Sequence, residues 1–201
     1  MAKNRDVQFL YEMGTIRLID RAWRRFLNTQ SANLAEHHFR MFWIAMTIAA
    51  NEKGVDTGKI AKMVLIHDIA ESRTGDVDYL SRQYVVRNEE LGIKDMLKGT
   101  AIEKEFMELW QEYEDRQTLE AKIVKDADNL DVDFELQEYA AQGNTLEAEF
   151  RGNRRKVSKS LFTDTAKELY AALQSDENSP HDWHTTGRNR LNGGDWQHLN
   201  D

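Results

Sequence analysis

The chain has 201 residues, a formal net charge of −8 and 40% hydrophobic residues, which suits one globular domain with a substantial core. The acidic balance argues against binding a nucleic-acid polymer, because phosphate contacts need clustered Lys and Arg. No apolar run approaches the ~20 residues that span a bilayer. The absence of cysteine excludes disulfides and thiolate metal sites. Together with an N-terminus that lacks an apolar signal segment, it predicts a cytoplasmic protein.

Apolar residues recur with helical spacing along most of the chain, and no alternating run predicts a strand. The pattern predicts an all-α domain over residues 1–175. Its helices are expected from about Phe9 toward Trp23, over 34–50, from Thr57 to Glu71, over 102–113, from Leu119 to near Gly143 and over 161–173, with a peripheral helix or mobile segment over 82–98. The 34–50 helix is apolar on nearly every side, which favours a central buried position. Residues 176–201 lack periodicity and are predicted to form a tail.

Two charged stretches accompany these helices. Residues 151–159 form a short basic cluster that opens a predicted helix, and its simplest interpretation is a solvated helix face. Four aspartates lie between Asp126 and Asp133, a density that usually marks a solvated acidic face. Asp128 differs because it flanks an apolar stripe, where an ionised carboxylate is costly unless it is paired or metal-bound. Asp133 is expected to be solvated.

The dipeptide His67-Asp68 is the most informative short motif, because Glu71 and the Thr-Gly-Asp turn at 74–76 follow it closely. On a helix, Glu71 lies four residues after His67 and returns to the same face. In a chain without thiolates, imidazole and carboxylate groups are the ligands for a divalent cation. The stretch therefore predicts part of a hydrolytic metal centre, although another His-Asp pair occurs at 181–182.

The other ligands must come from elsewhere in the chain. Glu36-His37-His38 begins the central apolar helix, and the aspartate run lies on the helix predicted over 119–143. Spacing alone leaves open which of the two histidines, and which aspartate, would join His67 and Asp68. Each piece has a structural alternative, since a buried histidine is more often a hydrogen-bonded core residue than a ligand. Only their joint order carries the metal-site prediction.

That order, His…His-Asp…Asp on successive helices, resembles the HD-domain metal-dependent phosphohydrolases, and in particular their 5′-deoxynucleotidase subgroup. The matching motifs span about residues 10–175 and are Glu36-His37, His67-Asp68-Ile69-Ala70-Glu71, Thr74-Gly75-Asp76 and Lys125-Asp126-Ala127-Asp128. The resemblance implies a helical bundle with a single metal site between its central helices. The metal ligands that it implies are His37, His67, Asp68 and Asp128. His38 would then be a core residue or a support for the ligands.

The resemblance also implies roles toward the substrate. In the subgroup an Arg followed closely by a Trp precedes the first ligand, and Arg21-Ala22-Trp23 is similar to this element with one residue inserted. Arg21 would grip phosphate oxygens, and Trp23 would contact the sugar, with core packing as its alternative role. Asp78 stands in a loop where the subgroup often has a Pro-Thr element, and it is a further candidate substrate contact.

Two carboxylates beside the ligands are the candidate proton-transfer groups. Glu71 would orient or deprotonate the attacking water, and its structural alternative is a salt bridge to Arg73. Asp76 would protonate the leaving oxygen or orient the substrate, and its alternative is to cap a helix.

The leading hypothesis is a 5′-nucleotidase that hydrolyses (deoxy)nucleoside 5′-monophosphates with one divalent transition metal per chain, which is Co, Mn, Fe, Zn or Ni. A homodimer is expected, with the exposed faces of the 102–113 helix as its interface. The alternatives are hydrolysis of phosphodiesters or nucleoside triphosphates, a non-catalytic nucleotide-binding or regulatory module, and an interaction protein whose Trp-containing tail docks a partner. A triphosphate would need more cationic side chains near the site, and the sequence shows no obvious surplus there.

Overall fold

The computed structural model describes residues 2–27 and 30–185, and every regular element in these ranges is a helix. The elements are α1 (Ala2–Met13), η1 (Ile16–Leu18), α2 (Arg24–Leu27), α3 (Leu34–Asn51), α4 (Thr57–Ile66), α5 (Glu71–Thr74), η2 (Ser81–Gln83), α6 (Glu89–Leu97), α7 (Glu103–Asp115), α8 (Leu119–Ala141), α9 (Glu147–Ser158), α10 (Asp164–Leu173) and α11 (Asp182–Thr185). Within the described ranges, β structure is confined to an isolated bridge between Asp20 and Asn33. The all-α prediction is confirmed.

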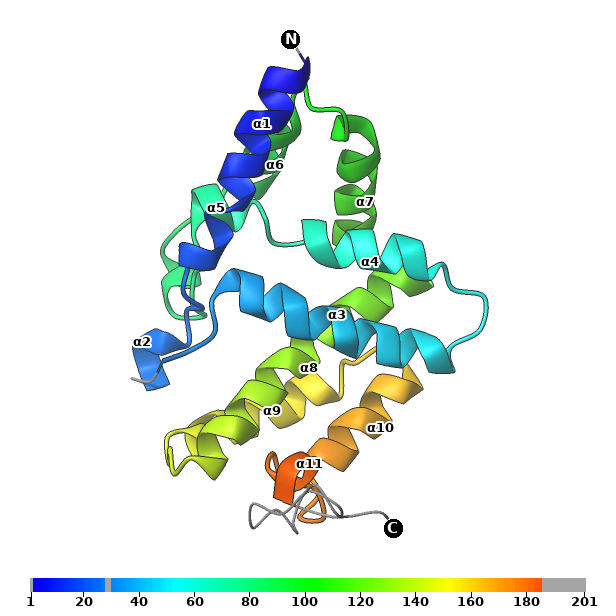
Figure 1. The fold of residues 1–201 in the computed structure, drawn as a ribbon. Helices are drawn as coiled ribbons and strands as arrows, with labels where there is room; N and C mark the ends of the chain where they lie inside the picture. Colours follow the sequence, from blue (N-terminus) through cyan, green and yellow to red (C-terminus); the bar gives the residue numbers. More distant parts are fainter. Residues whose placement is uncertain (1, 28–29, 186–201) are drawn as a thin grey trace, which may run out of the picture.

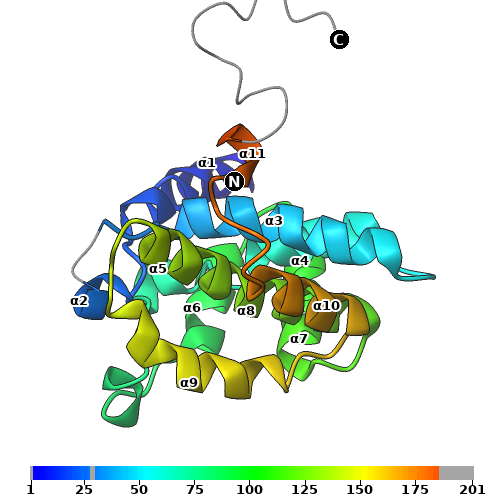
Figure 2. The same cartoon turned by 90° about the horizontal axis from the view of Figure 1, so that it is seen from below.

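Helices α3, α4 and α8 form the centre of the molecule (Figure 1). Helix α8 packs against α3, α4, α7, α9 and α10, and Figure 2 shows it between α3 and α9. Helices α1, α6 and α7 lie at one end of the bundle, and α9 to α11 lie at the other (Figure 1). The core between the central helices includes the fully buried side chains of Met41, Ile48, Met63, Ile123 and Leu130.

Side-chain caps set where the central helices begin. The side chain of Asn33 accepts a hydrogen bond from the backbone N–H of Glu36, and the Glu36 carboxylate accepts one from the backbone N–H of Asn33. Asp56 and Thr118 cap α4 and α8 through their own side chains. Each such cap contributes about 1 kcal/mol to helix stability. The capping box at Asn33 begins α3 so that His37 falls in its first turns, where it is fully buried.

The first helix both begins and ends earlier than its apolar spacing suggested, at Ala2 rather than near Phe9 and at Met13 rather than near Trp23. Helix α1 ends at Met13, so the predicted continuation toward Trp23 is wrong. The chain instead runs beside the start of α3, where the Arg21 N–H donates to the carbonyl of Ala32 at 2.9 Å and the Leu34 N–H donates to Ile19 at 3.0 Å. These long-range backbone bonds replace helical ones, and they hold the Arg21 segment next to α3.

The 34–50 helix is central, but it is not buried on every side. Phe39 and Trp43 on α3 are 69% and 57% exposed, whereas Met41, Ala45 and Ile48 are fully buried. The neighbours of α3 are α4, α8, α10 and η1, and they leave one face of the helix uncovered. The prediction of all-round burial was therefore wrong for that face.

Two charged residues that were expected to be solvated form a buried pair. The basic cluster lies on a separate helix, α9, that precedes the last predicted helix rather than opening it. From this helix Arg154 donates to both carboxylate oxygens of Asp133 at 2.7 Å and to the carbonyl of Asn129 at 2.7 Å. Asp133 and Arg154 are 3% and 9% exposed. The prediction of solvation is therefore wrong for Asp133 and for Arg154, because α9 packs along α8 and covers this face. The other basic residues of the cluster, Arg151, Arg155, Lys156 and Lys159, are exposed as predicted.

The surface and the C-terminal segment bear on the remaining predictions. No exposed large hydrophobic side chain of the described residues belongs to α7, so the face proposed for a dimer is polar, and the homodimer stays a prediction.

The predicted tail is described as far as Thr185. Within it, the Asn178 side chain donates to the carbonyl of Ala172 near the end of α10. Trp196 and His198 lie outside the described residues, and the domain boundary at 175 stays a prediction. None of the described helices is both long and apolar enough to cross a membrane.

Candidate metal centre

A break in the helix positions the His67-Asp68 motif. Helix α4 ends at Ile66 rather than continuing to Glu71, which corrects the predicted range, and α5 begins at Glu71. The residues between them form tighter turns, in which the Glu71 N–H donates to the Asp68 carbonyl at 3.0 Å. Sequence spacing did not reveal the break, because Ile69 and Ala70 within it are also buried. The break places His67 and Asp68 at the end of a rigid helix rather than along its side.

Four of the predicted residues converge from α3, the end of α4 and α8. His37, His67, Asp68 and Asp128 each offer one ligand atom, and these atoms all lie within 4.8 Å of one another. His67 Nε2 is 3.0 Å from an Asp68 oxygen, and His37 Nε2 is 3.4 Å from an Asp128 oxygen. The structure thus brings together the full ligand set implied by the resemblance, and it selects His37 over His38.

The donor atoms of the two histidines fit a cation. The Nδ1 of His67 lies 2.8 Å from the carbonyl of Val64, and the Nδ1 of His37 lies 2.6 Å from Asp131. Nδ1 therefore carries the proton in each neutral ring, which leaves both Nε2 lone pairs free. Both Nε2 atoms are buried without a hydrogen-bond partner. Buried polar atoms without partners are costly, and a divalent cation at this point would satisfy both.

The electrostatics of the cluster favour positive charge. Burial and the neighbouring Arg21 oppose protonation of His37, but the nearby carboxylates of Asp128 and Asp131 prevail and raise its pKa to about 9. The pKa of Asp128 is well below its usual value, because Lys125, His37 and His67 outweigh the effect of burial. A site that stabilises a buried imidazolium also favours a metal cation, whose binding would release that proton.

Asp131 is a functional candidate that the sequence analysis did not single out. Its carboxylate lies between His37 Nδ1 and Arg40 Nε, each at 2.6 Å, and Arg40 also donates to Glu138 at 2.7 Å. Asp131 lies three residues after Asp128 on α8, so one helix face carries both residues. That spacing was the available signal. A carboxylate that holds the second nitrogen of a ligand imidazole fixes the orientation of the ring and increases its basicity.

We expect Asp131→Asn to weaken metal binding by about 10- to 100-fold, because losing such a support typically costs this much affinity. Titration of the metal-free protein with Co²⁺ or Mn²⁺, followed by calorimetry, measures the change. Asp164→Asn is the matched control, since Asp164 pairs with Lys167 on the exposed surface of α10. Equal affinity in the two variants would contradict the role assigned to Asp131.

Two nearby polar residues have other partners or positions. His38 is buried and its ring centroid lies 4.8 Å from that of His67, but it is not part of the four-residue cluster. Asp126 is fully buried and accepts hydrogen bonds from the backbone N–H groups of Phe162 and Thr163 at 2.8 Å. It therefore secures the start of α10, which is a structural role on the same helix as the ligand Asp128.

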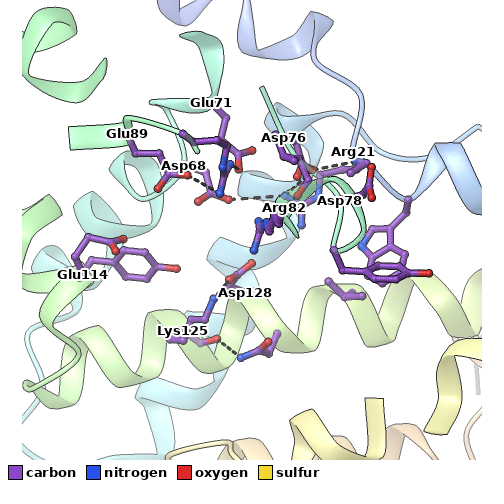
Figure 3. A pocket seen from close by; sticks show the side chains of 18 of the residues that line it. Arg21, Asp68, Glu71, Asp76, Asp78, Arg82, Glu89, Glu114, Lys125 and Asp128 are labelled. Atoms are coloured by element: carbon purple, nitrogen blue, oxygen red, sulfur yellow. Dashed lines mark hydrogen bonds and ion pairs between the residues drawn. The ribbon is translucent and has the colours of Figure 1, made fainter. Parts of the chain in front are cut away.

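The cluster opens into a cavity of about 350 Å³, within the usual size range of small-molecule sites. Figure 3 shows Asp68 and Asp128 in the middle of the site, with Arg21, Asp76 and Asp78 on one side and Glu114 on the other. Arg21 Nη1 lies 3.4 Å from Asp76 and 3.8 Å from Asp68. Arg21 is 8% exposed, and the surrounding carboxylates raise its pKa although burial opposes this.

Asp76 and Glu71 stand beside the metal cluster. Asp76 accepts a hydrogen bond from the backbone N–H of Ala22 at 3.0 Å, so it reaches across the site instead of capping a helix of its own segment. Gly75, with a φ of 76°, supplies the backbone turn for this reach. Glu71 accepts from Arg87 at 2.8 Å and not from Arg73, which pairs with Glu12 instead.

Glu71 has an unusual proton affinity. Burial, together with the charges of Asp68 and Asp76, raises its pKa to about 9. Its Oε2 is buried and has no hydrogen-bond partner. A nearby cation would lower this pKa by favouring the charged carboxylate. In that charged state one oxygen of Glu71 is held by Arg87 and the other is free to accept a hydrogen bond from water.

Trp23 and Asp78 both line the cavity. Trp23 also packs edge-on against Phe150 with ring centroids 5.1 Å apart, so it combines a core contact with a position at the site. Asp78 has both oxygens engaged, one by the backbone N–H groups of Leu80 and Ser81 and one by Arg25 at 2.8 Å. Its predicted contact with substrate stays a prediction, and its observed contacts are structural.

An all-α bundle with a buried site of two histidines and two carboxylates, open to a small-molecule cavity, defines the class of this protein. A model of the HD domain matches residues 13–174. The chain is 33% identical over 155 residues to a protein of Dictyostelium discoideum named 5′-deoxynucleotidase HDDC2, with 68% of this chain and 81% of the relative covered. The chain belongs to the HD-domain family, as its motifs predicted.

Solved structures confirm the fold. A conserved hypothetical protein from Pyrococcus furiosus is 25% identical, with a TM-score of 0.70 over 84% of this chain and 98% of its own. The HD phosphohydrolase DatZ of cyanophage S-2L, solved with dA and one catalytic Zn²⁺, is 21% identical with a TM-score of 0.53, covering 82% of this chain and 92% of its own. At that identity the likeness concerns the fold alone.

Proposed function

We propose that this protein is a divalent-metal-dependent 5′-nucleotidase that converts (deoxy)nucleoside 5′-monophosphates to nucleoside and phosphate. The observation that carries the proposal is the pair of unpartnered, buried Nε2 atoms beside Asp68 and Asp128, at the edge of a cavity. The relatives named 5′-deoxynucleotidase support the choice of substrate class.

The proposed cofactor is one transition metal per chain, held by His37, His67, Asp68 and Asp128. Two imidazoles and two carboxylates suit Co²⁺, Mn²⁺, Fe²⁺, Zn²⁺ or Ni²⁺. When bound, such a cation activates water and neutralises charge on the phosphoryl group.

The residues around the ligands supply the other parts of the reaction. Glu71, through its free Oε2, accepts the proton of the attacking water. As the new P–O bond forms and the bond between phosphorus and the nucleoside 5′-oxygen breaks, the departing oxygen takes a proton from water in the cavity, and Asp76, which is paired with Arg21, orients the substrate. Arg21, held by Asp76 and Asp68, donates to the phosphate oxygens.

The charge of the cavity bears on the triphosphate alternative. Five cationic side chains, more than the sequence suggested, and seven carboxylates line the cavity. The cations are Arg21, Arg82, Arg87, Arg116 and Lys125, and the carboxylates are Asp68, Glu71, Asp76, Asp78, Glu89, Glu114 and Asp128. The carboxylates outnumber the cations by two, and a bound divalent cation would neutralise this excess negative charge. A cavity with no surplus of positive charge suits a monophosphate better than a triphosphate, which carries more negative charge.

A panel of nucleotides tests the proposal. Metal-free protein supplied with each divalent metal in turn should release phosphate from dAMP or dGMP, and EDTA should stop the release. The corresponding triphosphates and bis(p-nitrophenyl) phosphate serve as comparison substrates. Turnover of only a triphosphate or diester would replace the proposed substrate class. Tight nucleotide binding without turnover under any metal would instead favour the non-catalytic module.

A further inference from the structure

Arg116 has a backbone conformation that is uncommon for its residue type. It ends α7 with φ 54° and ψ 27°, and it is the only residue other than glycine with a positive φ among the described residues. The left-handed conformation favours glycine because a Cβ crowds the backbone there. A residue that keeps such a conformation at the wall of a cavity points to a role for its side chain.

The guanidinium of Arg116 is held in place by an aromatic ring. Its central carbon lies 3.4 Å from the centroid of the Tyr113 ring. That ring packs edge-on against the imidazole of His67, with centroids 5.3 Å apart. Arg116 and Tyr113 both line the cavity. The stack therefore places a rigid cationic fork next to the metal cluster.

Arg116 differs from the other cations of the cavity in its contacts. Arg21, Arg87 and Lys125 each lie against carboxylates of the site, and Arg82 donates to the Val77 carbonyl. In the described part of the chain the Arg116 guanidinium makes no hydrogen bond, and its Nη1 is buried without an acceptor. Its one ion pair, with Glu114, is long at 3.7 Å. Its donors therefore remain available to an anion in the cavity.

We propose that Arg116 is a substrate-binding residue that donates to phosphate oxygens, on the opposite side of the metal cluster from Arg21. The proposal rests on the function proposed above. Arg116 Nη2 lies 3.7 Å from the Glu114 carboxylate, and Figure 3 shows Glu114 across the Asp68 and Asp128 carboxylates from Arg21. The aromatic side chains of Trp23, Phe26 and Tyr79 line the cavity with Arg21 and Asp76, and they suit the nucleoside. A phosphate at the cluster then has its remaining oxygens directed toward Arg116.

Arg116→Gly tests this role with little risk to the fold, because glycine favours the backbone conformation at this position. Because the variant loses a charge-assisted hydrogen bond to phosphate, we expect KM for dAMP to rise about 10- to 100-fold while kcat changes far less. The inhibition constant of inorganic phosphate should rise by a similar factor, and inhibition by deoxyadenosine, which lacks the phosphate, should be unchanged. Arg116→Lys should recover part of the loss, because it keeps the charge but not the planar fork.

The control variant is Arg155→Gln, which removes one exposed positive charge outside the cavity and should leave KM unchanged. Co²⁺ affinity and the unfolding midpoint, measured for every variant, detect a merely structural effect through Tyr113 and His67. Unchanged KM and phosphate inhibition in Arg116→Gly would overturn the proposal, and so would a loss confined to kcat or metal affinity.

Binding of inorganic phosphate by calorimetry separates this proposal from the proposed function. If the wild-type protein hydrolyses no nucleotide but binds phosphate, and Arg116→Gly weakens that binding, only the assigned reaction fails. If the wild-type protein hydrolyses dAMP and Arg116→Gly behaves like Arg155→Gln, only the role of Arg116 fails. A metal-loaded wild-type protein that neither binds phosphate nor hydrolyses dAMP would overturn both.

Discussion

Replacing both His67 and Asp68 with alanine is expected to abolish stoichiometric metal binding and phosphate release. The change removes two of the four ligand groups, including one of the two unpartnered Nε2 atoms that belong to the cluster. The remaining imidazole and carboxylate do not complete the coordination of a transition metal in the cluster. Elemental analysis after purification and a phosphate-release assay with dAMP measure the two effects.

The chain provides its own control for this experiment, because a second His-Asp pair, His181 and Asp182, lies at the start of the short helix α11. The same double change there should leave metal content and turnover unchanged. Circular dichroism of both variants verifies that the helical fold is retained. Phosphate release that survives the loss of His67 and Asp68 would refute the proposed metal-dependent reaction.

Glu71→Gln is expected to reduce kcat by about 10²- to 10⁴-fold, the usual contribution of a positioned proton-transfer group. The amide keeps the size of the side chain but cannot accept a proton from water. Because Glu71 is not in the ligand cluster, the variant should still bind one metal per chain. Steady-state kinetics on the metal-loaded variant, together with its metal content, measure these outcomes.

Glu89→Gln is the matched control, since Glu89 also lines the cavity and also pairs with Arg87. If Glu71 acts mainly by holding Arg87, the two variants should lose similar activity and similar stability. A proton-transfer role instead predicts a large loss of kcat for Glu71→Gln alone. Equal and small effects in the two variants would count against Glu71 as the base.

The motifs located most of the metal site before its geometry was known. The resemblance to the HD family implied His37, His67, Asp68 and Asp128, and these four residues converge in the structure. Residues whose role depends on a partner from a distant helix were not identified in this way. Asp131 and Asp133 looked like parts of one acidic run, yet Asp131 supports His37 and Asp133 pairs with Arg154.

The sequence likewise predicted which helices exist but not where all of them end. Periodicity identified the central helices, because burial of one helix face repeats apolar residues every three or four positions. It missed the break between α4 and α5, where the apolar pattern continues although the backbone turns. It also missed the end of α1, where backbone pairing with residues 32–34 takes over.

Local periodicity in the sequence by itself determined the all-α class, and the order of its motifs gave the resemblance to the HD family, which in turn implied the four residues of the candidate metal centre. Only the tertiary structure decided which nitrogen of each ligand histidine is free, which carboxylates are buried, and which cations of the cavity have donors without a hydrogen-bond partner. These features depend on contacts between residues tens of positions apart, such as Asp131 with His37. Burial and hydrogen bonding across such contacts set the charge state and the free donors of a site, and neither can be read from one helix alone.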